Sequence, residues 1–497
     1  MSELERLALG CVFPGFEGLE PAEWVRRRLA EGLGGVLLYA RNVERSDQLE
    51  SLTAALRAER EDVLVAIDEE GGDVTRLEAE SGSSYPGNAA LGAVDDVALT
   101  ERVARALGTE LAGVGVNLDF APVADVNSNP ANPIIGVRSF GSEPELVARH
   151  VGGFVRGLQG SGVAACAKHF PGHGDAAADS HLELPTIDVD AATLTARELA
   201  PFRAAIEADV RSIMTAHIRV PALDDVSATT SRIFLHDLLR EELGFRGMVV
   251  TDALEMGAIS ATVGVEEGAV RSLAAGADAL CLGHDLGDEA VESITAAIVT
   301  AVRSGRLAED RLADAFERVR TVSEWATDSA VTVVAHGDVG RLAARRAAVL
   351  EGDAELSRPA LIVELAEEPS IAVGASPGPG EWLRRSLPGS RLVRLESGSS
   401  LDLVQNRGAG AEQLVVVTRD AHRHPWQQAA AERLAAEHSA IVVEVGLPHW
   451  RPQTGTGFVA TYGAARVNLE AAASRLSEGA ILATRRGVEQ SGSSPGS

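Results

Sequence analysis

The chain has 497 residues, of which 45% are hydrophobic, so it is long enough for two or three domains with cores of their own. Its formal net charge of −27 excludes nucleic acid and anionic membrane surfaces as partners, because both bind basic protein faces. Its three cysteines (Cys11, Cys166 and Cys281) lie far apart in apolar runs, which indicates buried thiols rather than disulfides or a zinc site.

Short apolar runs alternate with helical patterns over the first 330 residues. We expect strands at 7–12, 35–39, 63–67, 115–119, 163–167, 211–215, 247–251 and 276–282. The segments 46–60, 98–113, 143–160, 192–207, 231–243, 264–274 and 286–303 repeat apolar residues every three or four positions, which is typical of helices. Eight strands alternating with helices favour an α/β fold of the TIM-like (β/α)8 barrel type over a doubly wound open sheet.

The remainder of the chain predicts a second, smaller domain. A helix at 308–326 closes the first unit, so we place a barrel at 1–330 and a connector at 331–356. Strands at 359–364, 413–417 and 440–445, with helices at 426–438 and 463–476, predict an α/β sandwich over 357–490. The residues 491–497 are expected to be a disordered tail.

Polar residues follow most of the predicted barrel strands. They are Asp68, Asp119, Lys168 with His169, His217, Asp252 and His284, after strands three to eight in that order. In a barrel these carboxyl ends lie on one face, where the active sites of such folds are built. The sequence therefore predicts a candidate active site on this face.

The densest polar cluster is KHFPGHGDAAADSHLELP, residues 168–185, with three histidines and two aspartates within 14 residues. In an extended segment Asp179 and His181 would share a side, so the carboxylate could bind one ring nitrogen and leave the other for proton transfer. His173 and Asp175 have the same spacing, and spacing alone does not choose between the pairs.

Three further segments carry charged residues with more than one interpretation. In LGFRGMVVTDALEMGAI (243–259), Asp252 could be a nucleophile, a metal ligand or the N-cap of the following helix. In VAIDEEGGDVTRL (65–77), Asp68 could bridge two sugar hydroxyls with Arg76 nearby, or lie in a solvated turn. In NPIIGVRSFG (132–141), Arg138 follows strand four and would by default be a surface arginine.

These four segments, in this order and spacing, resemble the family 3 glycoside hydrolases, and most of all their bacterial β-N-acetylglucosaminidase branch. The resemblance covers about residues 5–330 and is weaker over the sandwich. It implies that Asp252 is the nucleophile and that His181, with Asp179 behind it, is the acid/base. It also implies sugar binding by a further set of residues: Asp68, Arg76, Arg138, Lys168, His169 and Met256.

The implied reaction is retaining, exo-acting hydrolysis of terminal β-linked N-acetylglucosamine through a covalent glycosyl-aspartate intermediate. A neutral imidazole base repels anions less than a carboxylate does, so phosphorolysis is an alternative outcome. Two positions depart from the family pattern. Asp73 stands where an arginine often follows the double glycine, and Val137 stands where an acidic residue often precedes Arg138.

Three other functions compete with this interpretation. A metal-dependent amidohydrolase could use His169, His173 and His181 with Asp252, but no ligand set is complete by spacing, and Phe13-Pro14-Gly15 replaces the His-x-His expected after strand one. A non-catalytic sugar-binding protein would have lost the nucleophile or the loop, and both are present. A β-glucosidase of the same family would lack the Asp-Ser-His segment.

Location and partners follow from the same features. The start of the chain is acidic and no run approaches the roughly 20 apolar residues of a membrane span, so we expect a cytoplasmic protein. Its partner would be a small carbohydrate, either a cell-wall muropeptide fragment in peptidoglycan recycling or a chitin oligomer. We expect a monomer that needs neither a cofactor nor a metal, since a carboxylate and a proton donor suffice for the reaction.

Overall fold

The computed structural model describes residues 1–178, 183–283, 286–329, 337–367, 377–401, 404, 413–455 and 457–477. These residues form two compact units. The first holds Met1–Glu70, Thr75–Leu77 and the described part of Asp95–Val339. The second holds Gly71–Val74, Glu78–Val94 and the described residues from Gly340 onwards, so one loop of the first half of the chain belongs to the second unit.

The first unit is a closed parallel barrel. Its strands are β1 (Val12–Pro14), β2 (Gly35–Leu38), β3 (Leu64–Ile67), β4 (Leu118–Asp119), β5 (Ala164–Phe170), β6 (Ser212–Thr215), β7 (Met248–Val250) and β8 (Leu280–Leu282). Strands β2 to β7 pair in sequence order, and β1 pairs with β8. The isolated bridges Gly15–Leu37 and Val250–Ala279 join β1 to β2 and β7 to β8, which completes the ring. The predicted TIM-like barrel is confirmed.

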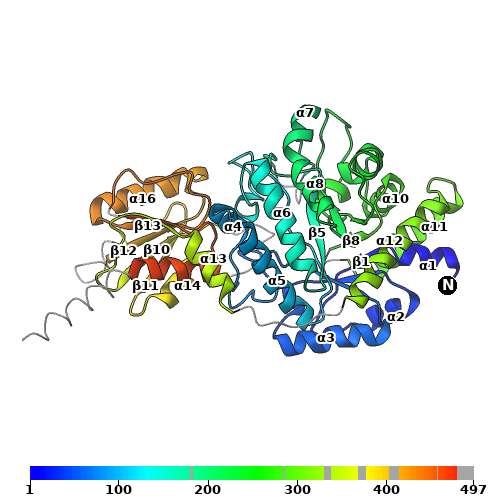
Figure 1. Cartoon of the computed structure of the whole chain (residues 1–497), viewed down its shortest axis with the longest axis horizontal. Coiled ribbons are helices and arrows are strands. Elements are labelled where there is room, and N and C mark those ends of the chain that lie inside the picture. The colour runs from blue at the N-terminus through cyan, green and yellow to red at the C-terminus, as the bar shows by residue number, and fades with distance from the viewer. Residues whose placement is uncertain are drawn as a thin grey trace, which may run out of the picture. The chain divides into compact units, whose positions relative to one another are not determined.

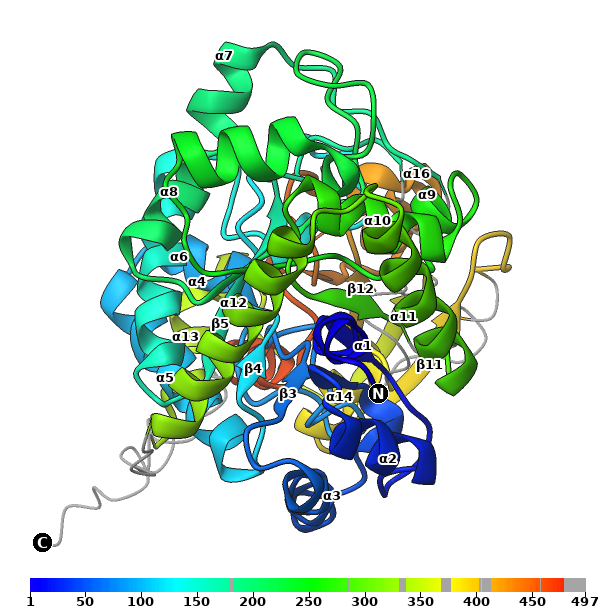
Figure 2. The same cartoon turned by 90° about the vertical axis from the view of Figure 1, so that its right-hand side faces the viewer.

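Helices surround the strands of this unit, as Figures 1 and 2 show. The longer ones are α1 (Glu3–Leu9), α2 (Glu23–Glu31), α3 (Ser46–Glu59), α5 (Val97–Gly113), α6 (Pro144–Gln159), α8 (Ala200–Glu207), η5 (Ile233–Glu242), α10 (Val265–Ala275), α11 (Asp288–Arg303) and α12 (Glu309–Asp328). Short turns of helix lie between them: η1 (Ala40–Asn42), η2 (Gly136–Arg138), α7 (Ala191–Thr193), η3 (Leu194–Glu198), η4 (Ala228–Thr230) and α9 (Gly257–Ser260). Within the described ranges, no helix combines the length and the apolarity that a membrane span requires.

The first predicted strand, at 7–12, is wrong over most of its length. Residues 7–9 end α1, and β1 begins only at Val12. The helix starts at a capping box, in which Ser2 Oγ accepts from the Glu5 amide and the Glu5 carboxylate accepts from the Ser2 amide. This local signal fixes the start of a helix ahead of the apolar run, and Ala8 and Leu9 are buried as helical residues.

The second unit contains one six-stranded sheet, with order β11-β10-β12-β13-β14-β9. Its strands are β9 (Val349–Gly352), β10 (Ala360–Leu365), β11 (Arg391–Leu395), β12 (Gln413–Thr418), β13 (Ile441–Glu444) and β14 (Gly457–Ala460). Only β9 is antiparallel to its neighbour. Helices accompany the sheet: α4 (Asn88–Val94), α13 (Val339–Ala347), α14 (Pro379–Ser386), η6 (Ala421–Arg423), α16 (Pro425–His438) and residues 466–477.

The two faces of this sheet pack into separate cores, which makes the unit an α/β sandwich. Val415 and Val443 pack with Trp382 of α14 on one face, while Val416 and Leu434 of α16 pack on the other. Three strands were not predicted. Strand β9 lies in the segment assigned to the connector. Strand β11 (RLVRL) contains two arginines and therefore has no continuous apolar run.

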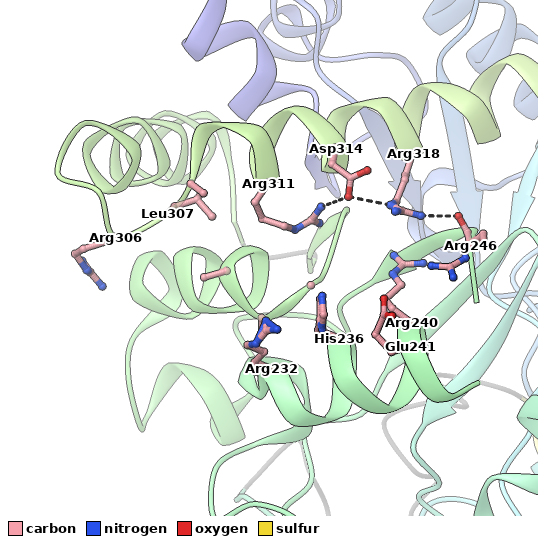
Figure 3. Close-up of a pocket in the computed structure, with 14 residues that line it drawn as sticks. Arg232, His236, Arg240, Glu241, Arg246, Arg306, Leu307, Arg311, Asp314 and Arg318 are labelled. Atoms are coloured by element: carbon pink, nitrogen blue, oxygen red, sulfur yellow. Dashed lines mark hydrogen bonds and ion pairs between the residues drawn. The ribbon is translucent and has the colours of Figure 1, made fainter. Parts of the chain in front are cut away.

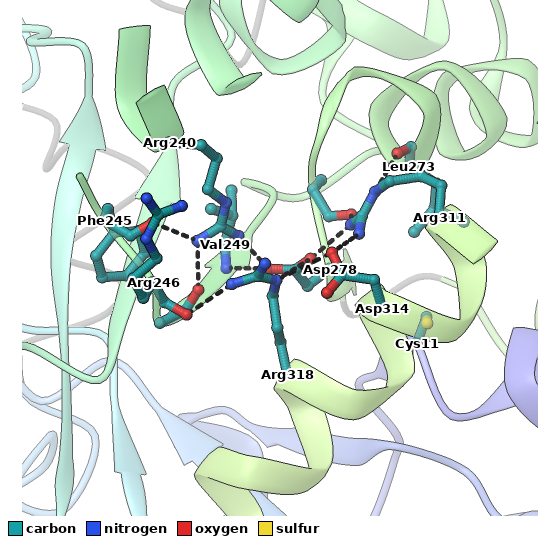
Figure 4. A network of polar contacts seen from close by, with 12 residues as sticks. Cys11, Arg240, Phe245, Arg246, Val249, Leu273, Asp278, Arg311, Asp314 and Arg318 are labelled. Carbon is teal, nitrogen blue, oxygen red and sulfur yellow. Dashed lines mark hydrogen bonds and ion pairs between the residues drawn. The ribbon is translucent and has the colours of Figure 1, made fainter. Parts of the chain in front are cut away.

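A buried polar network joins the elements at the amino-terminal end of the barrel (Figure 4). Asp278, which precedes β8, is fully buried. It accepts from Arg240 Nη2 and Arg311 Nη2 at 2.5 Å each, and from the Val249 amide at 2.8 Å. One carboxylate therefore links η5, β7, β8 and α12.

Arginines also line a cavity of about 390 Å³ beside this network (Figure 3). Arg311 and Arg318 of α12 both bind Asp314 there. Arg240 gives its other hydrogen bonds to the Phe245 and Gly247 carbonyls. Because these donors are engaged within the protein, the arginines serve to hold the barrel together on the face where such folds carry stability rather than catalysis.

We expect Asp278→Asn to lower the free energy of unfolding by about 3–5 kcal/mol, because it leaves the buried Arg240 guanidinium without its counter-charge and removes one of the two carboxylates that bind Arg311. Urea unfolding of the purified chain measures this loss. Asp314→Asn is the matched control, since that carboxylate is half exposed and should contribute only about 1 kcal/mol or less. Equal stabilities of the two variants would contradict the role assigned to Asp278.

Candidate active site

The sequence-predicted site residues of the first unit follow the carboxyl ends of its strands. Asp68 comes directly after β3, Lys168 and His169 lie near the end of β5, and Asp252 lies two residues beyond β7. Arg138 is the last residue of η2. Parallel strands of a barrel end on the same face, so β3, β5 and β7 present their polar residues to one region, and Arg138 joins it through its ion pair with Glu70.

Lys168 is the centre of a buried ionic cluster. Its Nζ atom lies 2.6 Å from Asp68 Oδ1 and 2.8 Å from Glu70 Oε1. Arg138 reaches the same glutamate with two parallel hydrogen bonds, from Nη2 to Oε1 at 2.7 Å and from Nε to Oε2 at 3.0 Å. Arg138 is therefore not a surface arginine, and Glu70 orients it although Val137 supplies no charge.

The neighbouring cations determine the charge of Glu70 in this cluster. Burial disfavours the ionised form of Glu70, but the cations of Arg138 and Lys168 outweigh it and hold its pKa far below its usual range. The side chains of Lys168 and Glu70 are 2% and 3% exposed, whereas Asp68 is 28% exposed. Asp68 is thus the member that faces solvent, with Lys168 and Glu70 behind it.

A second cluster orients the histidines of the 168–185 segment. Asp125 Oδ2 lies 2.7 Å from His169 Nδ1, and Asp125 Oδ1 accepts from the backbone amides of His169 and His173. This contact orients the His169 ring and directs its Nε2 atom away from the carboxylate. Burial, the larger cause, and the neighbouring His169 lower the pKa of His173 to about 4, so its ring is neutral near pH 7.

Asp252 is half-buried and is not a helix N-cap. Its Oδ1 accepts from the amide of the next residue, Ala253, at 2.8 Å. The helix that follows is the four-residue α9, and its N-cap is Met256. The N-cap interpretation of Asp252 is therefore wrong, because a turn at residues 254–255 separates the carboxylate from the helix. Met256 itself is buried.

The charges of Asp252 and Asp68 both act on Cys281 of β8. Burial raises the pKa of the Cys281 thiol well above its usual value, and the charges of Glu255, Asp252 and Asp68 raise it further. Cys281 belongs to β8, so the aspartates after β3 and β7 act on one point of the barrel. His217, after β6, supports this region through the 3.0 Å contact between its Nε2 and the Ala253 carbonyl.

Arg76 is held through its backbone. The amides of Arg76 and Leu77 both donate to Glu69 Oε2, at 2.7 and 3.0 Å. Burial raises the pKa of Glu69 to about 7 in spite of these hydrogen bonds. The Glu69 amide in turn donates to Asp119 Oδ1, and burial raises the pKa of that aspartate well above its usual range. Through these hydrogen bonds, Glu69 and Asp119 hold the backbone of the loop that carries Asp68 and Arg76.

Asp179 and His181 lie outside the described residues, so their predicted roles rest on the sequence. The alternative pair, His173 and Asp175, lies within the described residues. Asp175 binds Arg197 Nη2 at 2.8 Å, and the His173 ring lies edge-on to His169 with centroids 6.0 Å apart. In the residues that the structure describes, no three His, Cys, Asp or Glu side chains gather as a metal site.

Two residues with clear functions in these clusters were missed at the level of sequence. Glu70 holds Arg138 and Lys168, and Asp125 holds His169. A signal for each was present: Glu70 ends an acidic triplet directly after a strand, and Asp125 is a lone charge in the apolar run FAPVADV. A buried charge in such a run is retained only when it is paired.

The first unit is thus a parallel barrel with a cluster of buried charges at the carboxyl ends of its strands, which is where barrel enzymes build their active sites. The model of the Glycosyl hydrolase family 3 N terminal domain matches residues 18–322. The chain therefore belongs to glycosyl hydrolase family 3.

Similar proteins agree with this assignment. A family 3 β-N-acetylglucosaminidase from Paenibacillus sp. str. FPU-7 has a TM-score of 0.87 and 34% identity, covering 96% of this chain and 97% of that one. A beta-hexosaminidase of Neisseria meningitidis serogroup C is 38% identical over 56% of this chain and 80% of that protein. Beta-hexosaminidase A of Pseudoalteromonas piscicida is 35% identical over 63% of this chain, and this match spans only 57% of that relative.

Proposed function

We propose that this chain is a retaining exo-β-N-acetylglucosaminidase in which Asp252 is the nucleophile and His181, oriented by Asp179, is the acid/base. The observation that carries the proposal is the half-buried Asp252 at the end of β7, on the face that also holds the Asp68–Lys168–Glu70–Arg138 cluster. The activities named for the similar proteins support the same substrate class.

In this proposal the ionic cluster binds the terminal sugar. Asp68 is the exposed carboxylate and accepts from sugar hydroxyls, while Lys168, Arg138, His169 and Arg76 supply the surrounding donors. Glu70 makes no sugar contact; it holds two of the cations in place from behind. Such a prearranged set loses little entropy when the sugar binds, and it places the anomeric carbon against Asp252.

The reaction then has two steps. The Asp252 carboxylate attacks the anomeric carbon while His181 protonates the leaving oxygen, which forms a glycosyl-aspartate ester. His181, now neutral, takes a proton from water as that water attacks the same carbon and releases the sugar and the carboxylate. Met256 would line the pocket. The substrate would be a muropeptide fragment in peptidoglycan recycling or a chitin oligomer, and the chain would act as a cytoplasmic monomer.

The test compares release of nitrophenol from the β-N-acetylglucosaminide and from the β-glucoside, with EDTA present. We expect cleavage of the acetamido sugar alone. His181→Ala should lower the rate by about 10²–10⁴-fold, which is the usual contribution of a positioned proton donor. Loss of wild-type activity in EDTA would favour the metal-dependent alternative, and formation of the sugar 1-phosphate in phosphate buffer would make the enzyme a phosphorylase.

A further inference from the structure

The loop between β3 and α4 carries two of the candidate sugar-binding residues, Asp68 and Arg76, and passes through both units. Asp68 and Glu70 precede its tip, and Arg76 follows it. The tip itself, Gly71–Val74, belongs to the second unit, whereas Thr75–Leu77 return to the first. Asp73, one of the two departures from the family pattern, lies in this tip.

The tip is a tight turn that a larger residue could not form. Gly71 and Gly72 have positive φ angles of 73° and 64°, and Gly71 bridges to Val74. A Cβ atom on Gly72 would lie 2.4 Å from Gly87 Cα. The path of the backbone is therefore fixed, and the direction in which Asp73 points is fixed with it.

Both oxygens of Asp73 are bound by the second unit. Oδ2 forms an ion pair with Arg419 Nη2 at 2.5 Å, and Oδ1 accepts from the Ala464 amide at 2.7 Å. The Asp73 side chain is 2% exposed. Burial alone would lower the pKa of Arg419, but the charges of Asp73 and Asp420 outweigh it and raise it. Arg419 directly follows β12, a central strand of the sheet, so the anchor is rigid.

The return leg of the loop is bound on the other side by Glu69, which accepts from the amides of Arg76 and Leu77. Arg76 thus lies three residues from Asp73 and is held between two buried carboxylates. Three residues span at most about 10 Å of chain, so Arg76 lies within that distance of the Asp73 anchor.

We propose that Asp73 and Arg419 are a positioning pair, through which the second unit sets the loop that presents Asp68 and Arg76 to the sugar. This proposal rests on the proposed function. Neither residue of the pair is assigned a contact with substrate; each acts through the loop. The departure from arginine at position 73 thus places a carboxylate, and not a second cation, against Arg419.

The test measures kcat and KM for the nitrophenyl β-N-acetylglucosaminide in Arg419→Met, Arg419→Lys and the charge exchange Asp73→Arg/Arg419→Asp. We expect Arg419→Met to raise KM about 10- to 100-fold, with a smaller change in kcat, because a misplaced loop weakens sugar binding throughout the reaction. Arg419→Lys and the exchanged pair should recover most of this loss, since each restores an ion pair.

Arg394→Met is the matched control. It removes another ion pair of the second unit, between Arg394 Nε and Glu364 Oε2 at 2.9 Å, and Arg394 belongs to the edge strand β11, two strands away from β12. It should lower thermal stability and leave KM unchanged. Equal KM values for Arg419→Met and the wild type, or equal losses in Arg419→Met and Arg394→Met, would overturn the positioning role.

Failure of the proposed function gives a different pattern, because the wild type would then not cleave the glycoside. In that case, calorimetry measures the affinity of Arg419→Met and of Arg394→Met for N-acetylglucosamine. Weaker binding to Arg419→Met than to Arg394→Met would support the positioning pair, and identical affinities would overturn it.

Discussion

Asp252→Asn is expected to lower kcat/KM for the β-N-acetylglucosaminide by at least about 10⁴-fold, the range seen when a nucleophile is removed from an enzyme that acts through a covalent intermediate. The amide is nearly the same size as the carboxylate and keeps an oxygen for the Ala253 amide, so folding should not change. Steady-state hydrolysis and thermal unfolding, measured on the same preparation, separate chemistry from stability.

Chemical rescue makes this prediction specific for a nucleophile. Asp252→Gly leaves a space on the face of the sugar opposite the leaving group, so added azide should restore turnover and give the α-glycosyl azide. Asp209→Asn, at an exposed position of the first unit, is the control and should keep wild-type activity. Residual activity above about 1% in Asp252→Asn, with no azide product from Asp252→Gly, would assign the nucleophile elsewhere.

Lys168→Arg is expected to lower kcat/KM by about 10²–10³-fold although the charge is kept. Lys168 is the only lysine of the chain, in which Lys and Arg together number 45. Its ammonium group fits between Asp68 and Glu70 in a space that leaves the side chain 2% exposed. The planar, wider guanidinium group does not fit this space without moving Glu70, and Glu70 also holds Arg138.

Steady-state kinetics at one pH suffice for this comparison, since both side chains are cationic near neutrality. Arg149→Lys is the reciprocal control, because that arginine pairs with Asp95 on the surface and its exchange should leave kcat/KM unchanged. Activity of Lys168→Arg within threefold of the wild type would mean that a positive charge alone is needed at this position.

The fold class and most site positions followed from local patterns. Apolar runs bounded by polar residues predicted the barrel, and the residues just after those runs, such as Asp68 and Asp252, do lie at the carboxyl ends of β3 and β7. The errors were local too. At α1 a capping box outweighed an apolar run, and β11 was missed because its sequence has no such run.

By itself the sequence determined the order of the elements and which charged residues end the strands, because hydrophobic periodicity and turn residues act over a few positions. The tertiary structure alone decided which charges meet. Lys168 is 100 residues from Asp68, and Arg419 is 346 residues from Asp73. Such pairs form only when the barrel closes and the loop tip joins the second unit, and a buried charge is stable only where these distant partners come together.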